Sequence, residues 1–249
     1  MRLKTFLNYS PNFSTTKRRS KQIKFIIFHY TGMKNESGAI NRLTDVRSEV
    51  SSHYLIKKNG EVISLVPDLY IAWHAGVSFW KNYKSLNKDS IGIEISNPGH
   101  EFNYKKFSKK QIRSILKLTK FLIKKYKIES QNILGHSDIA PSRKKDPGEK
   151  FPWKYLSSKK IGYWHRLDQK KLIKNRDLKI SSLEKIIFFK NLIKIGYSKI
   201  APKNSNISKI KYMKIITKAF QRRFRQDQIN GIIDKECLMI SENLAKKLN

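Results

Sequence analysis

Two histidines and one aspartate stand where a folded chain could bring them together. His29 ends the apolar run KFIIFH and His136 ends the shorter run NILGH, and both runs are typical of buried strands. Sites assemble at the carboxyl ends of strands in open α/β sheets, so the two imidazoles are expected at one edge. Asp146, ten residues after His136, stands before a Pro-Gly turn that can fold its carboxylate back toward them. This set suits a catalytic zinc ion with three protein ligands and one position for water. Two hydrogen-bonded histidines and an ordinary surface turn are the alternative.

Glu94 lies in the middle of a strand that is otherwise apolar. In DSIGIEISN the isoleucines share one face, and Glu94 falls on the other face with Gly92 and Ser96. A buried carboxylate costs free energy unless it is paired or in use. If it faces a metal site, desolvation would raise its pKa and suit it to act as a general base on water. An ion pair with one of the many lysines is the alternative role.

Strands and helices alternate along the first part of the chain. Asn59-Gly60 stands between two strand-like runs and predicts a hairpin, and Ser108 with Gln111 forms a capping box that opens a helix. This pattern indicates an α/β fold, with a mixed central β-sheet flanked by helices. The expected elements are strands at 24–29, 89–97 and 132–136, a hairpin over 53–66, and helices at 37–50 and 108–127.

The second part of the chain is predicted to be a separate helical unit. Residues 1–155 are predicted to form the first domain, and the polar, basic residues 156–181 a linker. Residues 182–249 are predicted to form a small three-helix domain. The single cysteine, Cys237, excludes an intrachain disulfide and is expected to be a small core residue. The three expected helices span 183–195, 208–224 and 234–247.

Charge is the most unusual feature of the composition. The chain carries 53 Lys+Arg against 19 Asp+Glu, a formal net charge of +34. Backbone phosphates attract such a chain, so a basic nucleic-acid-binding protein is one hypothesis. The cations are spread along the chain and are not gathered into a tail or a stripe. Such a spread is more typical of the general composition of a source genome than of a binding site, although the positive field still favours anionic partners such as nucleic acid, lipid headgroups or acidic cell-wall polymer.

The N-terminal stretch carries no recognisable export signal. MRLKTFLNYSPNFSTTKRRSK lacks the apolar core of a secretory signal, and no later apolar run is long enough to span a bilayer. A cytoplasmic protein is therefore expected. A periplasmic protein is the alternative if the chain is a processed form.

Five segments of the chain resemble one known family. They are HYTGM, SSHYLIKKNGEV, AWHAG, IGIEISNPG and GHSDIAPSRKKDPGEKFPW, in the order of the zinc-dependent N-acetylmuramoyl-L-alanine amidases of the amidase-2 family. The resemblance covers about residues 10–155. Near the C-terminus, AFQRRFRQDQINGIIDKECLMISENL resembles more loosely a helical peptidoglycan-binding module. This two-part layout is similar to that of the AmiD-like branch of the family.

The resemblance implies a zinc hydrolase that cleaves the amide bond between N-acetylmuramic acid and L-alanine. The substrate would be peptidoglycan or muropeptides, including anhydro-muropeptides, in cell-wall degradation or recycling. The resemblance makes His29, His136 and Asp146 the ligands of one Zn²⁺ and Glu94 the catalytic acid/base. It requires no nucleic acid, and it leaves the oligomeric state open.

The resemblance also assigns residues around the scissile bond. Lys144 takes the place of a lysine that stabilises the oxyanion, and an alignment shift of one residue would give that role to Lys145. His74 and Trp73 in AWHAG are implied to line the substrate cleft. His53 is interpreted as structural because it lies inside a strand.

Three other functions are compatible with parts of the sequence. Some relatives of this fold bind peptidoglycan without cutting it, but they typically lack a zinc ligand, and this chain has all three candidates. A nucleic-acid-binding protein would owe its affinity to the basic charge and not to the histidines. A zinc peptidase would cut within the stem peptide and not at its sugar end.

Overall fold

The computed structural model describes residues 5–202 and 206–248. Short 3₁₀ turns connect several of its strands and helices. The strands are β1 (Thr5–Leu7), β2 (Phe13–Ser14), β3 (Phe25–Tyr30), β4 (Tyr54–Ile56), β5 (Val62–Ser64), β6 (Ile71–Ala72), β7 (Phe79–Trp80), β8 (Tyr83–Lys84), β9 (Ser90–Ile95) and β10 (Ile133–Gly135). The helices are α1 (Glu36–Thr44), α2 (Lys109–Tyr126), α3 (His136–Ile139), α4 (Trp153–Ser158), α5 (Gln169–Lys174), α6 (Ser182–Ile195), α7 (Lys209–Phe224) and α8 (Lys235–Lys246).

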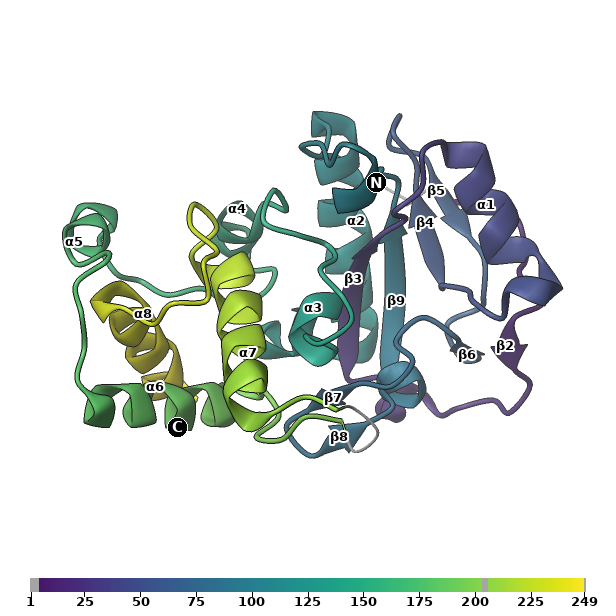
Figure 1. The fold of residues 1–249 in the computed structure, drawn as a ribbon. Helices are drawn as coiled ribbons and strands as arrows, with labels where there is room; N and C mark the ends of the chain where they lie inside the picture. The colour runs from purple at the N-terminus through teal and green to yellow at the C-terminus, as the bar shows by residue number, and fades with distance from the viewer. Residues whose placement is uncertain (1–4, 203–205, 249) are drawn as a thin grey trace.

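A six-stranded sheet lies at the centre of the molecule (Figure 1). Its strand order is β1-β5-β4-β9-β3-β10, and two short two-stranded sheets, β2-β6 and β7-β8, accompany it. β4 and β5 pair antiparallel, whereas the other neighbours in the large sheet pair parallel. The prediction of a mixed sheet flanked by helices is therefore confirmed.

β3 and β9 are adjacent inner strands of this sheet. Their sequences FIIFHY and SIGIEI are short apolar runs, as expected for parallel strands that are covered on both faces. The register places His29 opposite Glu94. On one face, Ile26 and Phe28 pack with the isoleucines of β9 in a buried cluster. The alternation that buries these side chains turns His29 and Glu94 to the other face.

α2 covers the first face because its apolar side chains fall on one side of the helix. Ser108 and Gln111 form the predicted capping box, which satisfies backbone N–H groups at the start of the helix. The helix then runs for 18 residues across the sheet. Its side chains in the buried cluster are Ile115, Leu118, Leu122 and Tyr126.

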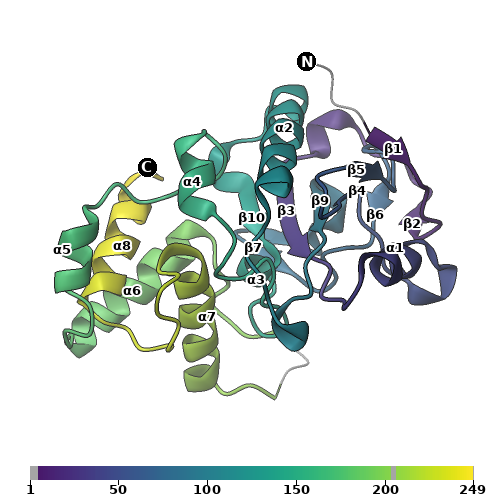
Figure 2. The ribbon, with the colours of Figure 1, turned by 90° about the horizontal axis from the view of Figure 1, so that it is seen from above.

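The second face is covered at its two ends. At one end, α1 packs on Leu55 of β4 and Ile63 of β5. At the other end, β3 and β10 pack against α3 and the C-terminal helices. Figure 2 shows α1 and α7 on the same side of the sheet, with α2 on the other side. Between the two covered ends, His29 and Glu94 face a pocket.

The helices differ from the predicted ranges at a few places. The helix predicted over 37–50 ends at Thr44, because Asp45 takes an extended backbone conformation and caps a separate 3₁₀ turn through the N–H of Arg47. α4 crosses the boundary predicted after residue 155, and α5 lies within the predicted linker. Over residues 5–202 and 206–248, no helix combines the length and the apolar character needed to cross a bilayer.

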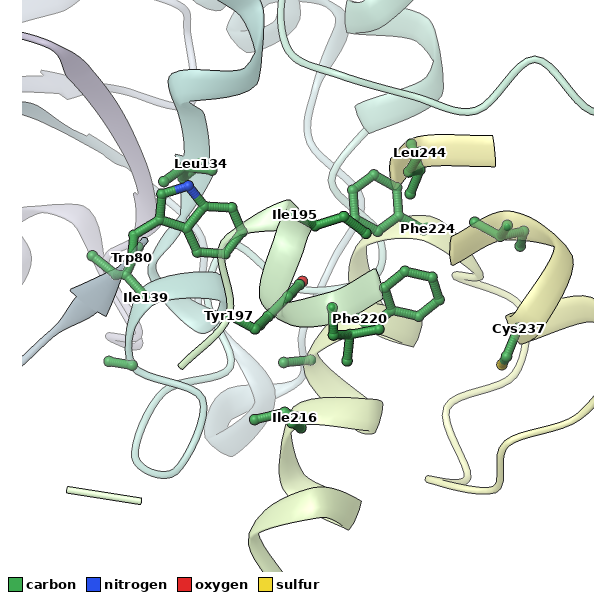
Figure 3. Packing of buried hydrophobic residues seen from close by; sticks show 14 of the residues in the cluster. Trp80, Leu134, Ile139, Ile195, Tyr197, Ile216, Phe220, Phe224, Cys237 and Leu244 are labelled. Atoms are coloured by element: carbon green, nitrogen blue, oxygen red, sulfur yellow. The ribbon is translucent and has the colours of Figure 1, made fainter. Parts of the chain in front are cut away.

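The C-terminal helices and the sheet share one hydrophobic cluster (Figure 3). Trp80 of β7 and Leu134 of β10 belong to this cluster, together with side chains from α6, α7 and α8. The Trp80 ring meets the ring of Tyr197 edge to face, with centroids 5.0 Å apart. Cys237 is buried in the same cluster, where burial raises the pKa of its thiol to about 12. The domain boundaries stay a prediction, but the two parts pack as neighbours with a common core.

A buried ion pair fastens α7 to α3. Arg223 Nη1 donates to Asp138 Oδ2 at 2.5 Å, and Arg223 Nη2 donates to the carbonyl of Ile133 at 2.8 Å. Tyr197 donates its hydroxyl proton to Asp138 Oδ1 at 2.8 Å, and the N–H of Gly135 donates to Oδ2 at 2.8 Å. Every charge in this group therefore has partners, although both ionic side chains are almost fully buried.

Arg223→Met is expected to destabilise the fold, because Asp138 would keep a buried charge without its partner. Breaking a buried pair by removing one member costs about 3–5 kcal/mol of unfolding free energy. Urea denaturation followed by circular dichroism measures this change. Arg47→Met breaks the exposed ion pair with Asp45 and is the matched control, with little expected change in the midpoint. An unchanged midpoint for Arg223→Met would contradict the role of the buried pair.

Candidate active site

Three donor atoms converge at the edge of the sheet where β3 ends. His29 Nδ1 lies 2.9 Å from His136 Nδ1 and 3.0 Å from Asp146 Oδ2. His136 Nδ1 lies 3.1 Å from the same carboxylate oxygen. All three side chains are buried, and their donor atoms are close enough to share one metal ion. The structure thus brings together the three residues that the sequence analysis selects as ligands.

The parallel pairing of β3 with β10 and the loop that follows α3 bring these three ligands to the same sheet edge. β3 pairs parallel with β10, so His29 and His136 emerge at the same sheet edge. The strand predicted over 132–136 ends at Gly135, and His136 becomes the first residue of α3. The loop after α3 folds back, and the N–H of Ser137 donates to the backbone carbonyl of Asp146 at 2.8 Å. This return brings the Asp146 carboxylate to the two imidazoles.

The donor set fits a small divalent metal ion. Nitrogen and oxygen ligands about 2.0–2.1 Å from a tetrahedral ion lie about 3.3 Å from one another. The three separations here are 2.9, 3.0 and 3.1 Å, so a small outward movement of the ligand atoms, away from one another, is all that such an ion requires. A tetrahedral ion with three protein ligands keeps one position for water or substrate.

The surroundings of these side chains favour the protonation states that can bind a metal ion. Burial, reinforced by the neighbouring His136, lowers the pKa of His29 to about 4, so this imidazole is neutral near pH 7. Burial alone would raise the pKa of Asp146, but His136 and His29 outweigh it and hold that pKa well below its usual range. A neutral imidazole and an ionised carboxylate are the forms that bind metal.

Glu94 lies beside the ligands on the same face of the sheet. It stands opposite His29 in the register of β3 and β9, and it lines the same pocket. Among the residues that the structure describes, its Oε2 has no hydrogen-bond partner. Burial, reinforced by Asp146 and opposed by Lys144, raises the pKa of Glu94 to about 8. A carboxyl group with a pKa in this range can take and return a proton near neutral pH.

The ligands and Glu94 open into a pocket of about 430 Å³. Lys144 and Lys145 both line it, but they differ in position. Lys144 is partly buried, and its charge lowers the pKa of both His29 and Glu94. Lys145 is exposed, and the main causes of these two pKa shifts are other groups. Lys144 is therefore the better placed of the two to act on a substrate at the ligands.

The residues of AWHAG occupy different depths of the pocket wall. Trp73 is half-buried and lines the pocket. His74 is only 8% exposed and lies behind His29, with its Nδ1 3.1 Å from His29 Nε2. Contact with substrate stays a prediction for both. His53 is fully buried and its Nδ1 accepts a hydrogen bond from the N–H of Gly92, in line with a structural role.

A tyrosine–histidine–glutamate chain at the pocket wall was not predicted from the sequence. Tyr30 Oη lies 2.9 Å from His100 Nδ1, and His100 Nε2 lies 3.0 Å from Glu149 Oε2. Tyr30 and His100 line the pocket. The signal available in the sequence was their position, because Tyr30 follows a predicted ligand directly and Glu149 comes shortly after another.

The sequence of this chain matches one family model and several curated proteins. Residues 19–149 match the family model of N-acetylmuramoyl-L-alanine amidase. The chain is 34% identical over 238 residues to N-acetylmuramoyl-L-alanine amidase AmiD of Escherichia coli (strain K12), and the match covers 91% of this chain and 83% of AmiD. It is 42% identical over 113 residues to 1,6-anhydro-N-acetylmuramyl-L-alanine amidase AmpD of Haemophilus influenzae, which covers 45% of this chain and 59% of AmpD.

Two solved structures resemble nearly the whole chain. The complex of Escherichia coli AmiD with the substrate anhydro-N-acetylmuramic acid-L-Ala-D-gamma-Glu-L-Lys matches with a TM-score of 0.78 and 32% identity, covering 94% of this chain and 92% of AmiD. AmpDh3 from Pseudomonas aeruginosa in complex with anhydromuramic pentapeptide matches with a TM-score of 0.77 and 30% identity, covering 95% of this chain and 96% of AmpDh3. The likeness therefore includes the C-terminal helices.

Asp146→Ala is expected to abolish tight binding of a divalent metal ion, because it removes one of three ligand atoms. The loss should exceed the roughly 10–100-fold that is typical when only an outer partner of a ligand is removed. Competition with a metal-sensitive dye measures the affinity. Glu94→Gln changes a carboxyl group in the same pocket and is expected to keep the metal. Wild-type affinity in Asp146→Ala would rule out this carboxylate as a ligand.

Proposed function

Because the chain belongs to the N-acetylmuramoyl-L-alanine amidase family, we propose that His29, His136 and Asp146 hold one Zn²⁺ and that the pocket hydrolyses soluble muropeptides. The enzyme cleaves the amide bond between N-acetylmuramic acid and L-alanine in peptidoglycan recycling. The observation that carries the proposed site is the convergence of three ligand atoms and Glu94 in one pocket.

The ligand set supports zinc as the metal. Catalytic zinc sites commonly combine imidazole nitrogens with a carboxylate oxygen and use three protein ligands. When bound, Zn²⁺ would supply a Lewis acid that makes water nucleophilic near neutral pH and polarises a carbonyl group. His29 and His136 bring no charge when neutral, so Asp146 provides the only anionic ligand of the three.

Glu94 is proposed to carry the proton. As a carboxylate it accepts a proton from the attacking water, whose oxygen forms a bond to the lactyl carbonyl carbon. As a carboxylic acid it returns this proton to the amide nitrogen when the C–N bond breaks, and L-alanine leaves as an amine. The raised pKa of about 8 keeps both forms accessible near neutral pH.

Lys144 is proposed to stabilise the negative charge on the carbonyl oxygen. The charge grows on this oxygen as water adds and disappears when the amine leaves. A fixed cation in a partly buried site stabilises such a charge more than a cation in bulk water does. The effect of Lys144 on the pKa of His29 and Glu94 supports a position of its ammonium group near the reacting atoms.

The pocket wall supports an anionic peptide as substrate. Muropeptides carry free carboxylates on the stem peptide, and Arg42, Arg143, Lys144 and Lys145 contribute positive charge to the wall. AmiD and AmpDh3 were solved with anhydro-muropeptides. We infer that soluble anhydro-muropeptides are substrates, with the intact sacculus as the alternative substrate. The cytoplasmic location stays a prediction.

Glu94→Gln is expected to lower kcat by about 10²–10⁴-fold, the usual contribution of general acid–base catalysis, while zinc content stays at one ion. Mass spectrometry of a digested anhydro-muropeptide measures release of the intact stem peptide. Cleavage within the stem peptide would identify a peptidase instead. Muropeptide binding without any release by the wild type would identify a recognition protein.

Lys144→Met and Lys145→Met form a matched pair that tests the oxyanion role. Lys144→Met is expected to lower kcat by about 10²–10³-fold, as for loss of one oxyanion donor. Lys145→Met should change kcat little, since the Lys145 side chain is exposed. Steady-state kinetics with one muropeptide separate the two variants. The reverse order of effects would move the role to Lys145.

A further inference from the structure

We propose that His74 is a positioning residue, which fixes the proton of His29 on Nε2 and so leaves the lone pair of His29 Nδ1 free for the metal. This inference rests on the proposed metal site. It gives His74 a role through His29, in addition to any contact with substrate. A series of hydrogen bonds links His29 through His74 and Ser90 to a backbone carbonyl, a group that can only accept.

This series of hydrogen bonds starts at the backbone carbonyl of Leu86. Ser90 Oγ lies 2.6 Å from this oxygen, and a carbonyl oxygen can only accept. The hydroxyl proton of Ser90 therefore points to Leu86. Ser90 Oγ also lies 3.2 Å from His74 Nε2. With its own proton in use, the hydroxyl oxygen accepts at this contact, so His74 Nε2 carries a proton.

The direction of the next bond follows from the first. A neutral imidazole has one N–H, so His74 with a proton on Nε2 has a lone pair on Nδ1. His74 Nδ1 lies 3.1 Å from His29 Nε2, which must then donate. His29 consequently has no proton on Nδ1. That lone pair faces His136 Nδ1 and Asp146 Oδ2.

Reversing the donors and acceptors in this series of hydrogen bonds would conflict with metal binding. If His74 donated from Nδ1, His29 would carry its proton on Nδ1, inside the triangle of ligand atoms. Ser90 would then donate to His74 and would give up its 2.6 Å bond to the buried carbonyl of Leu86. Losing this short hydrogen bond at a buried group costs free energy. Both consequences favour the direction that exposes the lone pair.

The segment that carries His74 also contacts the imidazole of His136. His136 Nε2 lies 3.2 Å from the backbone carbonyl of Ala75, which can only accept, and 3.4 Å from Arg143 Nη2, which can only donate, so these two contacts do not fix the proton of His136. Arg143 Nη2 donates to this carbonyl as well, at 2.5 Å. Asn87 Oδ1 accepts from the N–H groups of His74 and Ala75 at 3.1 and 2.7 Å and anchors the segment.

Because Gly92 has no side chain, the ring of His74 can pack directly against its backbone. A Cβ added at Gly92 would lie 2.5 Å from the ring, which is far inside contact distance. Ser90, Gly92 and Glu94 alternate along one face of β9. One strand face thus supplies the hydroxyl that orients His74, the gap that holds its ring, and the carboxyl group proposed to move the proton.

Three variants of the full chain test this role. His74→Phe keeps a ring but removes the acceptor of the His29 bond. His74→Asn places an amide oxygen near the position of Nδ1 and is the conservative rescue. His165→Phe replaces another buried histidine, 6% exposed and outside this pocket, and is the matched control. Zinc affinity is measured by competition with a chelating dye, and folding by thermal denaturation without metal.

His74→Phe is expected to bind Zn²⁺ about 10–100-fold more weakly than wild type, the usual effect of removing the outer partner of a histidine ligand. His74→Asn should recover most of this loss, and His165→Phe should bind like wild type. Long-range ¹H–¹⁵N spectra of metal-free wild type, in which no ion displaces a proton from Nδ1, should show a proton on His29 Nε2. This spectrum needs no variant, so it tests the proposal even if His74→Phe fails to fold.

Two results would overturn the inference. One is a folded His74→Phe that binds zinc within about twofold of wild type, against the 10–100-fold expected. The other is a spectrum with the proton of His29 on Nδ1. Either result leaves the proposed function intact if wild type binds one zinc ion and cleaves the amide. A wild-type protein that binds no zinc would instead refute the proposed metal site itself.

Discussion

The parallel pairing of β3 with both of its neighbours is the constraint on which the site depends. β10 on one side brings His136 to the edge where His29 emerges, and β9 on the other side brings Glu94 into register with His29. Parallel neighbours end at the same edge, so ligands that are distant in sequence need no long side chains to meet. The hydrophobic clusters on both faces hold this pairing, because a slip of one residue in β9 would turn Glu94 into the apolar cluster under α2.

Buried polar groups fall into two kinds in this molecule. Structural carboxylates have their partners within the fold: Asp68 accepts from Tyr54, Lys125 and Tyr126. Burial alone would raise the pKa of Asp68, but these donors outweigh it and lower that pKa. Glu94 differs, because one of its oxygens lacks a partner in the described ranges and its pKa rises to about 8. An unsatisfied carboxyl group in a pocket has a free-energy cost that a reaction can use.

The C-terminal helices support the site from outside. α3 begins with His136, and Asp138 in the same short helix is held by Arg223 of α7. A helix of four residues has little stability of its own, so its position depends on such contacts. The shared hydrophobic cluster around Trp80 adds apolar contacts between the same two parts of the chain. The helical part is thus a structural neighbour of the ligands as well as a predicted binding module.

The sequence by itself determined the elements and most of the candidate residues, because apolar periodicity, capping residues and polar residues at strand ends are local signals. It placed His29 and Glu94 in strands that the structure keeps, and His136 at the end of a strand, where the structure makes it the first residue of α3. It left the choice between Lys144 and Lys145 open, and it assigned His74 to the cleft without its contact to His29. Only the tertiary structure showed that Lys144 is partly buried whereas Lys145 is exposed, and that His74 contacts His29. The His74–His29 contact spans 45 positions and the Arg223–Asp138 pair spans 85, and such contacts arise from how loops and helices pack, which no local pattern encodes.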